Sequence, residues 1–343
     1  MNGLRSGKPG ARPYRLAHIA WTIIAMLIGI GVPPACWAGD QALPAHKPKV
    51  ALALGGGGTR GAAHVGVLRV LEQEGIPVDM VVGTSMGSIV GGLYCAGVSV
   101  DELEAMFDKQ TVMKNFMTVS LPVRLAAVPI FAIPHLFGWN PYDGFYFGNK
   151  LRKYLNSSLP EDRREIEKLK LPFAAVTTNL LDGQPHVITR GNVSRAMQAS
   201  SAVPVLRRPV LWDENGLLVD GAMVANVPVV PARELGADFV IAVDVDERLC
   251  RVPDSQFRKI GSVSKRIEQV YLARADAVQL KRADVVIHPN VDGIGLLSTK
   301  ISDAKAAIRA GEAATRAAIP EIRARLNLKP ATVSQPQDNR LPD

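Results

Sequence analysis

The chain has 343 residues, of which 47% are hydrophobic and 21% are charged, so it can bury one large core or two smaller ones. Its formal net charge is +8, but residues 1–38 hold four of the 40 basic residues and no acidic one, which leaves 36 basic against 32 acidic residues in the remainder. That remainder has no dense Lys/Arg stripe interleaved with aromatic residues, which argues against a nucleic-acid-binding protein.

Residues 1–38 have the layout of a secretory signal. A basic start precedes an apolar run at residues 16–32, and a proline-containing segment then leads to Cys36 and Ala38. Cleavage after Ala38 would place both at the small-residue positions of a cleavage site. Lipid attachment at Cys36 and an uncleaved anchor remain alternatives, since about 17 apolar residues is the lower limit for crossing a bilayer. We therefore expect a protein of the cell envelope, periplasmic or membrane-associated after Sec-type export.

A strand, a helix and a second strand are expected after a polar linker at residues 39–48. Residues 49–54 are a short apolar run that predicts a buried strand, and they lead into four glycines at 55–58. Residues 61–74 carry apolar side chains at helical spacing, and Gly75-Ile76-Pro77 ends that helix. Residues 79–82 form the next strand. Two hydrophobic strands joined by one helix are a βαβ unit, so the sheet is at least partly parallel.

The later elements continue the pattern of an α/β protein. Further strands are expected at residues 173–178, 216–219, 239–244 and 285–288. Helices are expected at residues 85–96, 101–108, 148–157, 163–168, 193–200, 262–281 and 303–325. The tail from residue 329 is rich in Pro, Gln and Asp, which predicts disorder.

Residues 111–139 differ from the rest because their apolar side chains come in blocks broken by prolines, with few charges. Two interpretations stay open for this segment. It can be an irregular cover of the core, or it can be an apolar lid or lipid-docking surface near a functional site, since exposed apolar patches commonly mark binding surfaces.

Gly83-Thr84-Ser85-Met86-Gly87 fits the pattern G-x-S-x-G between an expected strand and an expected helix. A serine there sits on a sharp turn, where small flanking residues relieve crowding and the hydroxyl projects from the strand end. The helix that follows also favours negative charge at its N-terminus. The strand–turn–helix context therefore makes Ser85 the candidate nucleophile.

The glycine run continues as Gly56-Gly57-Gly58-Thr59-Arg60-Gly61, which also fits the dinucleotide pattern G-x-G-x-x-G. That pattern needs an acidic residue at the end of the second strand, whereas Asp79 begins its strand. A P-loop is excluded because no Lys-Ser/Thr pair follows the glycines.

The same glycines suit a hydrolase, because their backbone N–H groups would lie near Ser85 and form an oxyanion hole. Arg60 has three possible roles: it could orient the loop, bind a lipid phosphate or form a salt bridge at the start of a helix.

Asp220-Gly221-Ala222 follows the strand expected at residues 216–219. Asp-Gly is most often only a turn, but a serine nucleophile needs a base. No histidine stands in an obvious loop after a late strand with a partnering acid; the six are His18, His46, His64, His135, His186 and His288. A carboxylate can accept the serine proton directly, so Asp220 is the candidate base. Such a base predicts a pH–rate curve with no limb near the histidine pKa of about 6.5.

Cysteine and histidine spacing predicts no metal site. The chain has no CxxC, no HExxH and no helical histidine pair. Its three cysteines are Cys36, Cys95 and Cys250. Cys95 stands in an apolar run and is expected to be a core residue, and a Cys95–Cys250 disulfide is possible in an oxidising compartment. The proposed chemistry needs no metal or cofactor.

These motifs, in this order, resemble the patatin-like phospholipases: a glycine-rich loop ending in Arg60-Gly61, a G-x-S-x-G elbow and a late Asp220-Gly221-Ala222. The resemblance extends to residues 199–204 and to Asn226-Val227-Pro228, and it covers about residues 50–246. Gly55 departs from the family, in which many members carry Asp before the glycines.

The resemblance implies that Ser85 is the nucleophile, Asp220 the general base, and the amides of Gly57, Gly58 and Met86 the oxyanion donors. Gly56, Arg60, Gly61, Gly83, Gly87, Gly221 and Ala222 support these motifs. The implied fold is α/β, a mostly parallel central sheet between layers of helices. The expected domains are a signal or anchor at 1–38, a linker at 39–48, a catalytic domain at 49–246, a C-terminal helical extension packed on the core at 247–328 and a disordered tail at 329–343.

The resulting hypothesis is a serine lipid acyl hydrolase acting at a membrane surface on phospholipids, lysophospholipids or neutral lipid esters. Three rival hypotheses remain: a nucleotide-binding protein that uses residues 56–61, a catalytically silent envelope interaction protein and an esterase with a Ser–His–Asp triad. The sequence identifies no protein partner.

Overall fold

The computed structural model describes residues 47–117, 142–259 and 261–329, and their strands form one eight-stranded sheet. The strand order is β5-β6-β3-β2-β1-β7-β8, with β4 paired to β3 beside this path. The strands are β1 (Val50–Leu54), β2 (Met80–Thr84), β3 (Phe173–Asn179), β4 (Pro185–Ile188), β5 (Val210–Asp213), β6 (Gly216–Asp220), β7 (Phe239–Val243) and β8 (Val285–Ile287).

The sheet is parallel across its five strands β3, β2, β1, β7 and β8 and antiparallel where β4, β5 and β6 join. In the parallel part, the carboxyl ends of the strands meet at one edge, which is where ligands bind in open α/β sheets. Strand β3 continues past the end of β2, which pairs with it only as far as Val176. Strand β6 pairs antiparallel with this extension of β3, so its last residue, Asp220, lies opposite Thr177, level with that edge.

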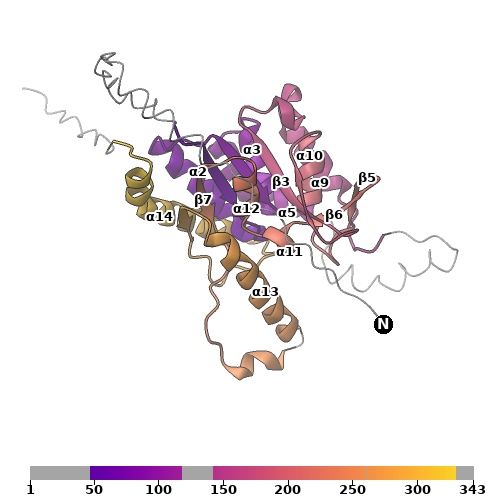
Figure 1. The fold of residues 1–343 in the computed structure, drawn as a ribbon. Coiled ribbons are helices and arrows are strands. Elements are labelled where there is room, and N and C mark those ends of the chain that lie inside the picture. The colour runs from indigo at the N-terminus through magenta and orange to yellow at the C-terminus, as the bar shows by residue number, and fades with distance from the viewer. Residues whose placement is uncertain (1–46, 118–141, 260, 330–343) are drawn as a thin grey trace, which may run out of the picture. The chain divides into compact units, whose positions relative to one another are not determined.

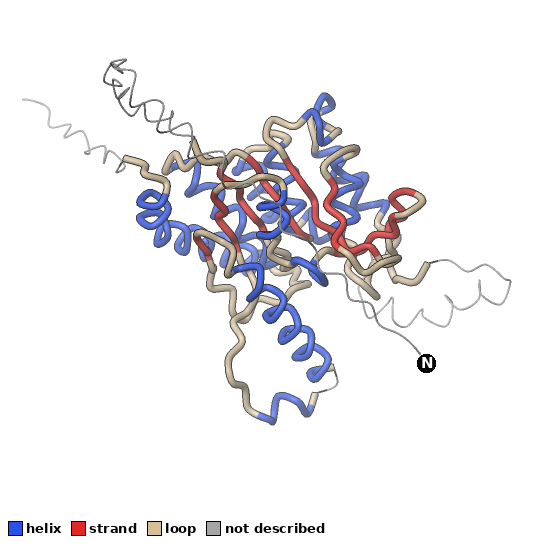
Figure 2. Tube along the Cα trace, viewed as in Figure 1, coloured by secondary structure: helices blue, strands red, loops and turns tan. Residues whose placement is uncertain are grey.

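Helices cover both faces of the sheet, as Figures 1 and 2 show. The helices are α2 (Ala63–Gln73), α3 (Met86–Cys95), α4 (Val100–Asp108), α5 (Thr111–Phe116), α9 (Asn149–Ser158), α10 (Val193–Ser200), α11 (Ala222–Ala225), α12 (Val229–Glu234), α13 (Ser262–Leu280) and α14 (Ile301–Arg325). The 3-10 turns are η1 (Gly58–Ala62), η2 (Glu161–Arg163), η3 (Ile166–Lys168) and η4 (Asp254–Arg258).

Strand β1 shows how one run of apolar residues serves two cores. Val50, Leu52 and Leu54 point into the larger core with α2, α3 and α14, whereas Ala51 and Ala53 point into the smaller one with α12. Successive side chains of a strand alternate between faces, so a strand covered on both sides must be apolar throughout. The result is the three-layer α/β architecture that the sequence predicted.

From Pro48 onward the described residues belong to one compact unit. Residues 247–328 add strand β8 to the sheet, and their helix α14 packs against α2 on the larger core. The boundary expected at residue 246 stays a prediction.

Residues 163–168 do not form the α-helix that the sequence predicted. The short turns η2 and η3 stand there instead, and Glu165 between them is extended, with φ −108° and ψ 139°. Glu165 pairs with Asn192, and the N–H of Ile166 donates to the carbonyl of Gly191. This pairing with a distant segment overrides the local helix propensity.

Several sequence expectations concern residues outside the described ranges: the secretory signal at 1–38, most of the linker at 39–48, most of the segment at 111–139 and the tail from residue 330. Among the helices described, none combines the length and apolarity needed to span a bilayer. Cys95 is buried and Cys250 is exposed, and both are free thiols, so the disulfide considered from the sequence is not formed.

Candidate active site

Ser85 occupies a strained turn between β2 and α3. Its backbone has φ 53° and ψ −121°, a conformation that non-glycine residues rarely adopt and that clusters at functional sites. The flanking glycines are sterically required. A Cβ on Gly83 would lie 2.5 Å from the carbonyl oxygen of Gly87, and one on Gly87 would lie 2.2 Å from that of Leu54. The motif therefore has the strand–turn–helix form that aims a serine hydroxyl out of the sheet edge.

Sheet register brings Ser85 to Asp220 across 135 residues of sequence. Thr84 pairs with Val176 of β3, and the next residue of β3, Thr177, pairs with Asp220 of β6. The residue that follows Thr84 is thus level with Asp220. The hydroxyl of Ser85 donates a hydrogen bond of 2.6 Å to Oδ2 of Asp220, and both side chains are buried.

Main-chain contacts fix the carboxylate of Asp220. Its Oδ1 accepts a hydrogen bond from the N–H of Ala222 at 3.0 Å, which leaves Oδ2 for Ser85. The hydroxyl of Thr178 donates to the carbonyl of Asp220 at 2.8 Å. Gly221 has no room for a side chain, because a Cβ would lie 2.3 Å from the carbonyl oxygen of Val176. The Asp-Gly-Ala segment is therefore a tightly packed turn that fixes the orientation of the Asp220 carboxylate.

Burial raises the pKa of Asp220 to about 6, and the hydrogen bonds from Ser85 and Ala222 offset this only in part. Ionised at neutral pH, Asp220 can accept a proton. The raised value also corrects an expectation drawn from the sequence. Because its pKa is about 6, Asp220 itself should give an acidic limb near pH 6 in the pH–rate profile. A limb in this range therefore does not distinguish a carboxylate base from a histidine base.

The glycine loop leaves two backbone donors without acceptors beside Ser85. Gly55 and Gly56 donate their N–H groups to the carbonyls of Val243 and Asn226, whereas those of Gly57 and Gly58 donate to no group in the described part of the chain. A Cβ on Gly56 would lie only 3.1 Å from Cβ of Ser85. Gly57 and Gly58 line the same cavity as Ser85, and free N–H groups beside a nucleophilic serine are the basis of an oxyanion hole.

Gly58 combines a positive φ with a tight contact. Its φ is +55°, and a Cβ would lie 2.1 Å from the carbonyl oxygen of Leu296, which also accepts the N–H of Thr59. We expect Gly58→Ala to displace the loop and to lower ester hydrolysis about 10²-fold or more, the usual effect of losing one oxyanion donor.

Gly75→Ala is the matched control for Gly58→Ala. Gly75 has φ +60°, but a Cβ there would meet no atom within 4 Å, so this variant carries only the conformational cost of about 1 kcal/mol. Its rate of hydrolysis should match that of the parent, while its unfolding free energy drops slightly. Equal activity of both variants would show that the loop at Gly58 tolerates displacement.

Arg60 and His64 anchor the glycine loop. The Arg60 side chain is buried, donates to the carbonyl of Ile294 at 2.7 Å and pairs with Glu247 at 2.8 Å. Of its three possible roles, these contacts show the salt bridge at the start of a helix, and together with the bond to Ile294 this ion pair also fixes the loop. They do not favour the binding of a lipid phosphate. Nε2 of His64 contacts the carbonyl oxygen of Gly55 at 2.8 Å.

No histidine in the described ranges competes with Asp220. His64 is fully buried, and burial lowers its pKa to about 4. His288 contacts Asp244, and neither of these histidines nor His186 lines the cavity at Ser85. A Ser–His–Asp arrangement is therefore not formed by the described residues. The dinucleotide-binding interpretation also lacks the acidic residue that it needs at the end of the second strand. Asp79 stands before that strand and accepts a hydrogen bond from the backbone N–H of Val50.

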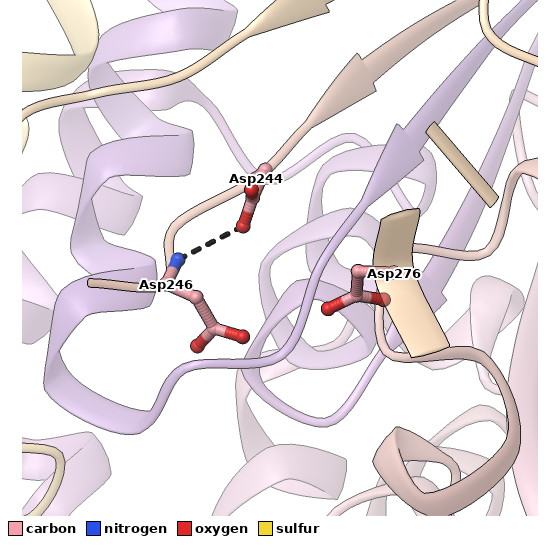
Figure 3. A group of neighbouring side chains, drawn as sticks. All are labelled: Asp244, Asp246 and Asp276. Atoms are coloured by element: carbon pink, nitrogen blue, oxygen red, sulfur yellow. Dashed lines mark hydrogen bonds between the residues drawn. The ribbon is translucent and has the colours of Figure 1, made fainter. Parts of the chain in front are cut away.

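Three carboxylates that sequence analysis did not single out lie next to the loop. Oxygens of Asp244, Asp246 and Asp276 come within 4.8 Å of one another. Figure 3 shows these three side chains. The amide nitrogen of Asn226 donates to both Asp246 and Asp276, at 3.0 and 3.1 Å. Burial first, and then neighbouring carboxylates, raise the pKa of Asp246 to about 7. Asp246 and Asp276 lie 20 and 50 residues from Asn226 in sequence, so no local motif marks the cluster.

Asn226 links this cluster to the glycine loop. Its carbonyl accepts the N–H of Gly56, and its Oδ1 lies 2.5 Å from the position of a Cβ on Gly56. Asp276 accepts the N–H of Val227 as well as the Asn226 amide. Asn226 and Val227 thus form hydrogen bonds both with the glycine loop and with α13.

A mainly apolar cavity of about 490 Å³ opens beside Ser85 and Asp220. Its wall includes the glycine loop together with Met86, Ile89, Met113, Phe116, Phe145, Leu206, Leu272 and Leu296. Met113 and Phe116 belong to α5, which is the described part of the apolar segment at 111–139. The cavity has room for the hydrocarbon part of an ester substrate.

A family model of the patatin-like phospholipases matches residues 52–233, which is more than half of the chain and includes both Ser85 and Asp220. The chain belongs to the patatin-like phospholipase family. This agrees with the family suggested by the order of its motifs.

Relatives among characterised proteins point to the same family. The chain is 37% identical over 196 residues to Lysophospholipase NTE1 of Mycosarcoma maydis, covering 57% of this chain and 10% of that protein. It is 34% identical over 200 residues to human patatin-like phospholipase domain-containing protein 6, covering 57% of this chain and 13% of that protein. The chain thus spans only about a tenth of the length of these relatives.

Solved structures also resemble this chain. The crystal structure of VipD from Legionella pneumophila has a TM-score of 0.45 and 14% sequence identity, covering 80% of this chain and 67% of that one. Human GIVD cytosolic phospholipase A2 has a TM-score of 0.45 and 12% identity, covering 82% and 60%.

Proposed function

We propose that this patatin-like protein is a serine lipid acyl hydrolase in which Ser85 is the nucleophile and Asp220 the general base. The observation that carries the proposal is the buried 2.6 Å hydrogen bond from the Ser85 hydroxyl to the Asp220 carboxylate, beside free backbone donors and an apolar cavity. A nucleophile within hydrogen-bonding reach of a fixed base is the arrangement that covalent catalysis requires.

Acylation begins when Oγ of Ser85 attacks the ester carbonyl carbon and its proton passes to Oδ2 of Asp220. The carbonyl electron pair moves onto oxygen, where the N–H groups of Gly57, Gly58 and Met86 stabilise the charge. When the tetrahedral intermediate collapses, the carbon–oxygen ester bond breaks. The leaving alcohol takes the proton from Asp220, and the acyl group stays on Ser85.

Deacylation repeats these steps with water. Asp220 accepts a proton from the attacking water, and the same N–H groups stabilise the second tetrahedral intermediate. The bond between the acyl carbon and Oγ of Ser85 then breaks, the serine recovers its proton from Asp220, and the fatty acid leaves. No step needs a cofactor.

A lipid ester is the substrate class we propose. The cavity wall is mostly apolar, and the relatives' names include lysophospholipase and phospholipase. The signal-like residues 1–38 favour an envelope location, periplasmic or membrane-associated, where such lipids are available.

A panel of lipids tests this proposal and narrows the substrate. The full chain should release fatty acid from at least one of a lysophospholipid, a diacyl phospholipid and a triacylglycerol, and a fluorophosphonate probe should label it. A chain that neither hydrolyses any of these lipids nor reacts with the probe would favour the silent envelope protein among the rivals.

A further inference from the structure

Helix α13 carries an apolar stripe that the fold does not cover. Val263, Ile267, Tyr271 and Val278 are exposed by 53%, 65%, 48% and 62%. At about 100° per residue they fall within roughly 80° of one another around the helix. Asp276, the one buried residue of α13, lies on the opposite side. The stripe is therefore an outward face of the helix, interrupted by the exposed Arg274 between Tyr271 and Val278, while its other face holds it to the protein.

Basic side chains surround this stripe. Residues 248–259 lead into α13 and expose Leu249 and Phe257. Together with α13 they expose six basic residues, Arg248, Arg251, Arg258, Lys259, Lys265 and Arg274, against two exposed acidic ones, Asp254 and Glu268. None of these six basic side chains forms an ion pair with another described residue. We call residues 248–259 and the exposed face of α13 the α13 surface.

The α13 surface stands next to the candidate active site. Leu272 and Glu268, on another side of α13, line the cavity that contains Ser85. The hydroxyl of Tyr271 donates to the carbonyl of Met223, a second cavity residue, at 2.8 Å. Figure 1 shows α13 extending away from the sheet, with its later part near α11. The stripe and the cavity are thus separated by about the width of one helix, roughly 10 Å.

We propose that the α13 surface docks on an anionic lipid bilayer, with the stripe among the lipids and the basic residues at the headgroups. A helix that exposes aliphatic and aromatic side chains on one face, with Lys/Arg around them, has the composition of an interfacial membrane helix. Positive charge favours this occupant over a second copy of the chain, because two identical basic surfaces repel each other. Any contribution of docking to catalysis depends on the proposed lipid hydrolase function. Membrane binding by the α13 surface does not depend on that function.

Vesicle binding by the full chain carrying Ser85→Ala tests the proposal without interference from hydrolysis. Binding to phosphatidylcholine vesicles that contain phosphatidylglycerol should be clearly tighter than to phosphatidylcholine alone, and high salt should weaken it. Arg258→Glu together with Lys259→Glu should weaken binding to the anionic vesicles at least about tenfold. Lys168→Glu together with Lys170→Glu makes the same charge change before β3, at the opposite edge of the sheet, and should leave binding unchanged.

A tryptophan at position 267 reports on the helix itself, whatever residues 1–38 contribute to binding. In anionic vesicles with brominated acyl chains, Ile267→Trp should show quenched, blue-shifted emission compared with the parent. Unquenched emission, or equal binding by both charge-reversal variants, overturns the proposal. So does a dimer that Ile267→Ser dissociates without affecting vesicle binding, because the stripe would then pair two copies. If the chain docks normally but hydrolyses no lipid, only the proposed function is wrong, and the docking proposal stands.

Discussion

Replacing Ser85 by alanine is expected to abolish ester hydrolysis, with a loss on the order of 10⁵- to 10⁶-fold, and to eliminate labelling by a fluorophosphonate probe. The reason is that the acyl-enzyme needs an oxygen at this position, and no other hydroxyl contacts the Asp220 carboxylate among the described residues. The fold should survive, because the backbone contacts of the turn do not involve Oγ of Ser85. Fatty acid release from lipids and probe labelling measure the two losses.

Ser88→Ala is the matched control for Ser85→Ala. Ser88 lies one turn later in α3, is also buried, and donates its hydroxyl only to the carbonyl of Ser85. Its removal should cost about 1 kcal/mol of stability and leave hydrolysis within the same order of magnitude. If Ser85→Ala retains turnover comparable to that of Ser88→Ala, Ser85 is not the nucleophile.

The elements that the sequence predicted well are those specified by local patterns. Strand β1 is an unbroken apolar run, and the G-x-S-x-G motif needs glycines because a Cβ on Gly83 or Gly87 would lie within 2.6 Å of backbone atoms. The edge strands β4 and β5 were missed. Each has four residues and is only partly buried, so neither shows a clear period. Helix α5 was also missed, because its sequence adjoins the proline-broken segment and its buried side chains form no long helical stripe.

The functional features that sequence analysis missed depend on distant contacts. The pairing of Ser85 with Asp220 was proposed from the lack of a suitable histidine and from the resemblance, but its cause is the register of β2, β3 and β6, which no local pattern encodes. The raised pKa of Asp220 follows from burial, and burial is a property of the folded chain. The carboxylates around Asn226 come from α13 and from the residues just after β7, so only the packing of these segments reveals them.

Replacing Asp220 by asparagine is expected to lower hydrolysis about 10⁴-fold or more, because the amide nitrogen cannot accept the Ser85 proton. The acidic limb of the pH–rate profile, expected near pH 6, should disappear with it. Asp276→Asn is the matched control, since Asp276 is another buried carboxylate whose pKa is raised to about 6, and it does not line the cavity. That variant should retain activity within about tenfold. Comparable activity of Asp220→Asn and the parent would indicate a different base.

The same substitution should make the protein more stable. The pKa of Asp220 is higher in the folded protein, about 6, than its ordinary value of 3.8, so the folded state holds the proton more tightly. Ionisation of this group therefore destabilises the fold as pH rises from about 4 to 6, by up to roughly 3 kcal/mol above that range. Asp220→Asn removes this cost. Its unfolding free energy should equal that of the parent near pH 4 and exceed it increasingly up to about pH 7. A difference that instead grew toward acid pH would mean that the folded protein favours the ionised carboxylate.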